Sequence, residues 1–262
     1  MIWRRGTVLA AVIALMAAGA GAAKAGAAEA PNPCPDVRPP AILLPRLRDA
    51  MLANNEAVIV TVGSSSTLGT RSSDVAHSYP AVLQRDLETA LPNAHIPVIN
   101  RGVGGEDVME ELPRLAQDVI GVRPTTVIWQ VGANGAMRHE PLETFQRLLT
   151  TGVRLLQEAR IDVILMDNQR APLLLSNTEA PQIEQVMANV AKATGVALFA
   201  RGALMDRWRD DGFPYASFMS DDGVHHNDLG YRCLAGALAG AILEGLKQPV
   251  HMPIALDVMA RH

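Results

Sequence analysis

From residue 57 onward, two patterns of hydrophobic and polar positions alternate along the chain. Short runs of β-branched and other apolar residues predict five strands, and longer segments with apolar residues at every third or fourth position predict amphipathic helices. The predicted strands cover residues 57–62, 96–100, 126–131, 162–166 and 196–199. The predicted helices cover residues 79–91, 108–120, 141–159, 180–194 and 229–246, and a first helix is expected at residues 40–53.

The central strands in this pattern are apolar at successive positions, not at alternate ones. The stretches VIWQV and VILM are examples, and such runs are typical of strands that helices cover on both faces. Strands that alternate with helices predict βαβ units and a parallel sheet. The expected fold class is therefore α/β, with a single three-layer α/β/α domain around a five-stranded parallel sheet. The loops at the carboxyl ends of its strands gather on one edge, where ligands bind.

The start of the chain differs in composition from the rest. The basic segment MIWRR precedes the apolar run GTVLAAVIALMAAGAGAA, and small residues follow. This order predicts a secretory signal peptide at residues 1–25, with cleavage as late as residue 30. The alternative is an uncleaved membrane anchor, although the run is shorter than the roughly 20 residues that a span requires. We expect a secreted or periplasmic protein with no stable membrane insertion after cleavage.

The remaining chain divides into three parts. We expect a proline-rich lead-in with the first helix at residues 26–56, the main domain at residues 57–248 and a C-terminal tail at residues 249–262. Cys34 and Cys233 are the only two cysteines. In an exported protein they either pair as a disulfide or remain as structural or free thiols, and their spacing suggests neither metal nor redox chemistry.

Composition and charge narrow the possible functions. Of the 262 residues, 48% are hydrophobic, which is enough for a full core. The formal net charge of −4 becomes −7 when the three basic residues of the signal peptide are removed. No basic patch is evident, so we expect no nucleic-acid partner.

The stretch VTVGSSSTLG, which ends the first predicted strand, raises the question of its chemistry. It lacks the Gly-Lys-Ser/Thr ending of a phosphate-binding loop, and the Gly104-Gly105 pair lacks the spacing of a dinucleotide fingerprint. A serine on a sharp strand-to-helix turn, by contrast, is typical of a nucleophile, which needs a nearby base and donors for an oxyanion. Near the C-terminus, Asp222 precedes His225 by three residues, an offset that lets a turn bring the carboxylate onto the imidazole.

Four segments lie at successive strand ends or loops beyond residue 56, namely GSSST, NRGVGG, VGANG and DGVH. Together, and in this order, they resemble the SGNH hydrolase family, also called GDSL esterases and lipases. The resemblance implies a flavodoxin-like fold with Ser65 as nucleophile, His225 as base and Asp222 as its orienting acid. It also implies an oxyanion hole made by Gly105, Asn134 and the amide of Ser65.

The chain departs from the family pattern at two positions. The usual aspartate before the nucleophile is Ser64 here, and the acid that often follows the asparagine of the third segment, Asn134, is Gly135.

Several residues next to the four segments have structural interpretations in place of, or beside, a role in catalysis. His226 is expected at the surface or rim, Trp129 and Gln130 are expected to pack within their strand, and three residues after the fourth strand either touch the substrate or cap their loop, namely Asn168, Gln169 and Arg170.

The expected function is that of an exported serine esterase that cleaves carboxylic esters through an acyl-enzyme, with no cofactor and no metal. A metal site built on His225, His226 and nearby aspartates has no second ligand cluster to support it. The substrate class remains open among small-molecule, lipid and glycan esters, and so does the oligomeric state. Two alternatives are an O-acetyltransferase acting on an envelope polysaccharide and a non-catalytic carbohydrate-binding module on the same fold.

Overall fold

The computed structural model describes residues 33–248. The predicted signal peptide at residues 1–25, the start of the lead-in and the predicted tail at residues 249–262 lie outside the described residues, so the proposed division of the chain stays a prediction.

Five parallel strands form the sheet, as predicted. They are β1 (Ile59–Gly63), β2 (Val98–Gly102), β3 (Thr126–Gln130), β4 (Asp162–Met166) and β5 (Ala197–Phe199). The strand order is β2-β1-β3-β4-β5, with Ile59 in register with both Val98 and Thr126. This is the flavodoxin-like order, in which β1 and β3 lie side by side and their connections leave on opposite faces. The fold class expected from the sequence is therefore confirmed.

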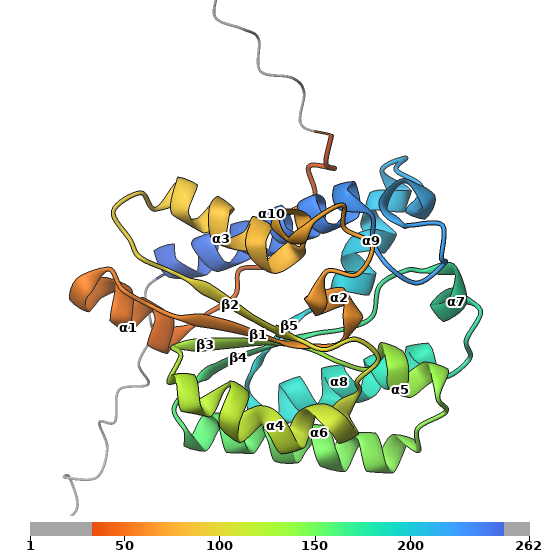
Figure 1. Cartoon of the computed structure of the whole chain (residues 1–262), viewed down its shortest axis with the longest axis horizontal. Helices are drawn as coiled ribbons and strands as arrows, with labels where there is room; N and C mark the ends of the chain where they lie inside the picture. Colours follow the sequence, from red (N-terminus) through yellow and green to blue (C-terminus); the bar gives the residue numbers. More distant parts are fainter. Residues whose placement is uncertain (1–32, 249–262) are drawn as a thin grey trace, which may run out of the picture. The chain divides into compact units, whose positions relative to one another are not determined.

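Helices cover both faces of this sheet (Figure 1). On one face lie α3 (Tyr79–Ala90), α9 (Arg201–Asp210) and α10 (Asp228–Lys247), and on the other lie α4 (Val108–Asp118), α6 (Leu142–Glu158) and α8 (Ala180–Thr194). Three short helices follow strands β1, β3 and β4 directly, namely α2 (Ser65–Leu68), α5 (Ala133–Met137) and α7 (Pro172–Leu175). Single 3-10 turns occupy Val75–His77, Ile120–Val122 and Tyr215–Phe218.

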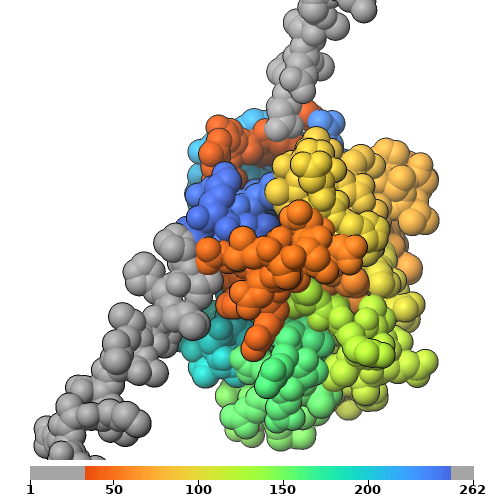
Figure 2. Space-filling model, turned by 90° about the vertical axis from the view of Figure 1, so that its left-hand side faces the viewer, coloured from red at the N-terminus to blue at the C-terminus, as the bar shows by residue number. Residues whose placement is uncertain are grey.

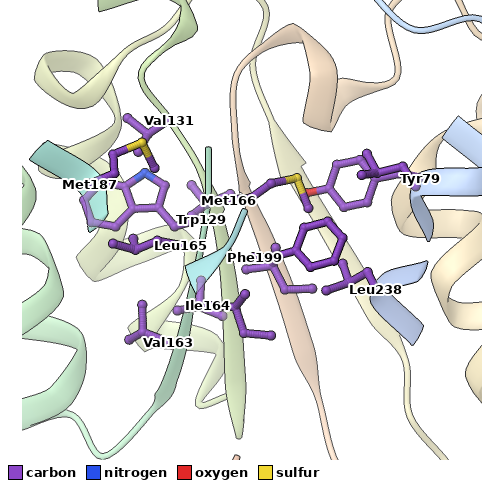
Figure 3. Close-up of a cluster of buried hydrophobic side chains, with 14 of the residues drawn as sticks. Tyr79, Trp129, Val131, Val163, Ile164, Leu165, Met166, Met187, Phe199 and Leu238 are labelled. Atoms are coloured by element: carbon purple, nitrogen blue, oxygen red, sulfur yellow. The ribbon is translucent and has the colours of Figure 1, made fainter. Parts of the chain in front are cut away.

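The core consists of the two faces of the sheet and the helices packed on them. In Figure 3, Leu165 and Trp129 point to the side of Met187 from α8, whereas Met166 points to the side of Phe199 and Tyr79. Residues 163–166 of β4 are all buried, because successive side chains of a strand point to opposite faces and both faces are covered. This burial explains why the sequence of β4 is apolar throughout.

The first helix, α1 (Pro45–Asn54), begins five residues later than predicted. Residues before it run as extended chain, and the N–H of Ile42 donates to the carbonyl of Ala241 in α10. The carboxylate of Asp162, at the start of β4, accepts the N–H groups of Arg46 and Leu47 at 2.8 and 3.0 Å, so the free donors of the helix N-terminus are satisfied from a distant strand. Figure 2 shows α1, in orange, on the face turned toward the viewer, and in Figure 1 it lies at the end of the sheet away from α2, α5 and α7.

A disulfide joins Cys34 to Cys233, so of the two possibilities left open by the sequence the paired form is present. Cys233 lies in α10, which packs on α3. By length and composition, α10 is also the helix among the described residues that is long and apolar enough to cross a membrane, but about half of it is buried within the fold, as in the core helix of a folded domain.

Helix α9 is an addition to the predicted helices, since the sequence pattern places none between residues 199 and 229. Its sequence RGALMDRWRD has charged residues on all sides and no continuous apolar stripe. The helix is held by tertiary contacts instead, because Leu204, Met205 and Trp208 are buried and Gly202 donates its N–H to the carboxylate of Asp167. Burial raises the pKa of that carboxyl to about 7.

Candidate active site

Ser65 is the first residue of α2 and sits on a sharp turn at the carboxyl end of β1. The turn requires glycine at position 63, where an added β carbon would lie 2.5 Å from both the Gln130 carbonyl and the Thr67 hydroxyl. Ser64 and Ser66 are buried, whereas Ser65 is partly exposed. Of the three consecutive serines, Ser65 is therefore the one that a substrate can reach.

The Gln130 side chain supports this turn from the neighbouring strand. Its Oε1 accepts the N–H of Ser64 at 3.2 Å, the hydroxyl of Ser64 at 3.0 Å and the hydroxyl of Thr67 at 3.2 Å. Ser64, which replaces the family's aspartate, thus donates inward to a buried amide. Gln130 is fully buried within β3, as expected, and it also accepts three hydrogen bonds beside the predicted nucleophile.

Ser65, His225 and Asp222 form a continuous hydrogen-bonded chain. Ser65 Oγ lies 2.7 Å from His225 Nε2, and His225 Nδ1 lies 2.7 Å from Asp222 Oδ2. A carboxylate at Nδ1 favours the tautomer with its proton on that atom, which leaves Nε2 free to accept the proton of Ser65. The structure therefore brings together three residues that the sequence separates by 160 positions.

Asp222 is held by more hydrogen bonds than the histidine alone provides. Its Oδ1 accepts the N–H groups of Val224 and His225 at 3.0 and 2.9 Å and the hydroxyl of Ser220 at 2.7 Å. Burial by itself would raise the pKa of Asp222, but these hydrogen bonds and that of the His225 ring outweigh it and hold the pKa well below its usual range. The group is therefore ionised at neutral pH.

Arg71 is a site residue that the sequence did not indicate. Its Nε lies 3.0 Å from Asp222 Oδ2, the same oxygen that accepts from His225, and Arg71 has a left-handed backbone with φ +71. Asp221, the competing acid in the sequence, is 90% exposed and only approaches Arg71 at 3.8 Å. The three-residue offset thus identified the carboxylate that contacts the histidine.

The turn that carries His225 is fixed from two sides. Gly223 adopts φ +73, which lets the chain double back so that Asp222 reaches the imidazole. Gln169 is buried and donates from Nε2 to the Val224 carbonyl at 2.8 Å.

His226 is fully buried, contrary to the surface or rim position expected for it. Burial lowers its pKa to about 3, so its Nδ1, 3.1 Å from the Phe218 carbonyl, donates from a neutral ring.

Of the predicted oxyanion residues, Gly105 lies on the loop after β2 and Asn134 lies in α5, which follows β3. Gly105 has φ +84, and a β carbon at the adjacent Gly104 would lie 4.0 Å from that of Ser65, which places this loop beside the serine. Asn134 donates from Nδ2 to the Glu106 carbonyl at 2.7 Å. A carboxamide has two N–H groups, so one remains for a ligand. No hydrogen bond joins Asn134 or Gly105 to Ser65 itself.

Arg138 also contacts the loop that carries Gly105. Its guanidinium donates to the Gly105 carbonyl and, at 2.9 Å, to the buried carboxylate of Asp107. Asp107 in turn caps α4 by accepting the N–H of Met109. The peptide groups that follow Gly105 are therefore tied to α5 and α4 and do not move as a free loop.

A pocket of about 240 Å³ lies between the residues that follow β4, α7 and the start of α8, and neither Ser65 nor His225 lines it. Gln169 and Arg170 line it together with apolar residues of α7 and the start of α8, such as Leu174 and Leu175. Arg170 is held by ion pairs with Glu184 at 2.6 Å and Asp206 at 3.0 Å. Gln169 and Arg170, which follow β4, therefore make hydrogen bonds and ion pairs within the fold and also line this pocket. Asn168, before them, is fully buried.

Within residues 33–248, no group of three acidic, histidine or cysteine side chains is arranged to hold a metal.

A serine, a histidine and an aspartate linked by hydrogen bonds at the carboxyl edge of a parallel sheet have the arrangement that Ser-His-Asp hydrolases use. The chain matches the model of the Non-GDSL lipase-like family over residues 27–248, and it belongs to that family. The family and the fold assign it to the hydrolases that act on ester bonds.

Two solved structures of similar fold are described as esterases. A two-domain esterase (CEX) active on acetylated mannans superposes with a TM-score of 0.67 at 20% identity, covering 79% of this chain and 55% of that one, so the present chain spans about half of that protein. An acetylxylan esterase, Axe2 of Geobacillus stearothermophilus, superposes with a TM-score of 0.62 at 20% identity over 74% of this chain and 95% of its own. Among curated protein sequences, none matches the chain.

Proposed function

We propose that the protein is an exported serine esterase of the SGNH type that hydrolyses carboxylic esters through an acyl-enzyme. The observation that carries the proposal is the chain of two 2.7 Å contacts from the partly exposed Ser65 hydroxyl through His225 to Asp222. A hydroxyl is a weak nucleophile unless an adjacent base takes its proton, and the tautomer fixed by Asp222 supplies that base.

The reaction follows from this geometry. Ser65 Oγ attacks the ester carbonyl and its proton passes to His225 Nε2. The oxyanion is stabilised by the N–H groups of Ser65 and Gly105 and by the second N–H of the Asn134 amide. His225 then gives its proton to the leaving alcohol, and a water molecule, activated by the same histidine, releases the acid and restores Ser65.

The proposal on location has two independent supports. The order of basic, apolar and small residues at the start of the chain is that of a signal peptide. The Cys34–Cys233 disulfide fits an oxidising compartment such as the periplasm or the exterior of the cell.

For the substrate, we propose an ester with a short acyl group. The similar structures named above are described as acting on acetylated mannans and acetyl-xylooligosaccharides, so acetylated oligosaccharides are the first natural substrates to test.

The test is hydrolysis of p-nitrophenyl acetate, butyrate and octanoate, and release of acetate from acetylated xylo- and manno-oligosaccharides. The purified chain is compared with Ser65→Ala and with Ser176→Ala, a control that removes an exposed hydroxyl bonded only to the Leu173 carbonyl. We expect activity in the wild type and the control and none in Ser65→Ala. Equal activity in all three would refute Ser65 as nucleophile. Acetyl transfer to a sugar acceptor, in place of hydrolysis, would favour the O-acetyltransferase.

A further inference from the structure

The α5 segment supplies one proposed oxyanion donor and also positions the loop that supplies another. Asn134 reaches the Glu106 carbonyl, and Arg138 reaches the carbonyl of Gly105 and the carboxylate of Asp107. The distance between the two donors therefore depends on how α5 and the residues after it are held. The position of α5 in turn depends on the residues packed against its buried side, where Gly135 lies.

Glu140 places a carboxyl group against the buried side of α5, at Gly135. It is 7% exposed, and neither of its carboxyl oxygens has a hydrogen-bond partner among the described residues. Its N–H donates to the Gly135 carbonyl at 2.9 Å, which folds the chain back under α5. Burial first, and then repulsion from Asp107 and Glu110, raise the pKa of Glu140 to about 7, while Arg138 opposes the rise. A buried carboxyl without partners destabilises a fold, so stability alone gives no reason for an acid here.

Gly135, the residue directly after Asn134, explains where this carboxyl lies. A β carbon built at Gly135 would stand 2.9 Å from Glu140 Oε2 and 3.8 Å from the ring of Phe145. The Gly135 backbone does not have positive φ, so backbone conformation does not require glycine at this position. Instead, the Glu140 carboxyl fills the space that a side chain at position 135 would occupy, so a larger residue at 135 would have to displace that carboxyl.

We infer that Glu140 is a positioning residue of the oxyanion hole, whose carboxyl stands under Asn134 in place of a side chain at position 135. It touches no substrate. It acts by packing against α5 at Gly135 and so fixes the position of the Asn134 amide relative to the Gly105 loop, which Asn134 and Arg138 contact. The inference of a role in the oxyanion hole rests on the proposed function of this site. That the Glu140 carboxyl occupies the space of a side chain at position 135 is independent of that function.

The decisive test is an exchange of the carboxyl between the two positions. Kinetics with p-nitrophenyl acetate at pH 6.5 and thermal unfolding are measured for Glu140→Ala, Glu140→Gln, Gly135→Asp and the double variant Gly135→Asp/Glu140→Ala. Glu143→Ala, which removes an exposed acid at the start of α6, is the matched control.

We expect Glu140→Ala to lower kcat about tenfold to a hundredfold with little change in KM, because a displacement of about 1 Å at a catalytic donor costs that much. Glu140→Gln, which keeps the shape, should stay within about threefold of the wild type in kcat, because a carboxyl with a pKa near 7 is largely neutral in the assay. Gly135→Asp alone should be impaired, and the double variant should regain at least tenfold in kcat over Glu140→Ala. The control should match the wild type.

Two results would overturn the inference. One is a Glu140→Ala variant with the kcat of the wild type, and the other is a folded double variant no more active than Glu140→Ala. If the wild type hydrolyses none of the esters, the proposed function is wrong, and the exchange is then read from unfolding alone. In that case a double variant that unfolds at a higher temperature than Gly135→Asp supports the shared space, and equal temperatures refute it.

Discussion

Replacing Gln130 by leucine should disturb the nucleophile turn more than any other change that leaves the catalytic chain intact. The Gln130 side chain is fully buried, and its Oε1 accepts three hydrogen bonds, two from Ser64 and one from Thr67. Leucine has nearly the same length and keeps the packing but removes the acceptor. The change therefore isolates the hydrogen bonds.

The magnitude follows from those three contacts. Each neutral hydrogen bond contributes about 1 kcal/mol net, so their loss costs about 3 kcal/mol. Gln130 Nε2 has no partner among the described residues, and its removal returns about 1 kcal/mol, which leaves about 2 kcal/mol of destabilisation. For a domain of this size that corresponds to a fall in Tm of about 4–8 °C. Because Ser65 lies in the same turn, we also expect kcat to fall by about a hundredfold.

The assay combines thermal unfolding with steady-state hydrolysis of p-nitrophenyl acetate. Gln185→Leu is the matched control, since this glutamine is exposed on α8 and its amide bonds only Asn189 within the same helix. The control should keep the Tm and kcat of the wild type. The reasoning is refuted if Gln130→Leu unfolds within about 1 °C of the wild type and keeps its kcat, because the three contacts would then support nothing.

Three further predictions concern the oxyanion donor, the buried acid of α4 and the disulfide. Asn134→Ala should keep the fold and lower kcat about a hundredfold to a thousandfold, and an unchanged kcat would remove Asn134 from the mechanism. Burial raises the pKa of Glu111, which accepts from Trp129 Nε1 at 2.6 Å, to about 8. Its contribution to stability is thus full below the ordinary carboxyl pKa and is lost as pH rises through 8, so the wild type should lose more Tm between pH 6 and pH 9 than Glu111→Gln, and equal losses would contradict this. Reduction of the Cys34–Cys233 bond, which closes a loop of 199 residues, should cost up to about 5 kcal/mol, and a Tm unchanged by dithiothreitol would count against it.

Much of the fold could be predicted from local patterns. Helix α8 and strand β4 have the predicted bounds, because their apolar spacing and flanking residues agree with the structure that packing imposes. The exceptions share a cause. Helix α1 begins at Pro45, a proline at the first helical position, and the carboxylate of Asp162 accepts its free N–H groups from a distant strand. In α9, Arg201 lies on the same face as the apolar residues and interrupts their stripe. Neither the Asp162 contact nor the burial of Arg201 leaves a signal in the local sequence.

The same division holds for the site. The spacing from Asp222 to His225 predicts their contact because three residues of turn suffice to bring the two side chains together, and the structure shows that contact at 2.7 Å. Arg71 and Gln169 could not be found in this way, since they meet the histidine turn from segments about 150 and 55 residues away. An arginine in a serine-rich loop and a glutamine after a strand are ordinary residues until the fold brings them to a catalytic carboxylate or a neighbouring carbonyl.

By itself, the sequence determined the order of strands and helices, the parallel sheet and the serine, histidine and aspartate at its edge. These depend on periodicity and on short offsets along one chain. The tertiary structure alone decided which groups hold those residues in place, namely Gln130 under the nucleophile turn, Arg138 on the Gly105 loop and Glu140 in the space left open at Gly135. The physical reason is that hydrogen bonds, burial and filled space depend on distances between segments, and those distances exist only once the chain has folded.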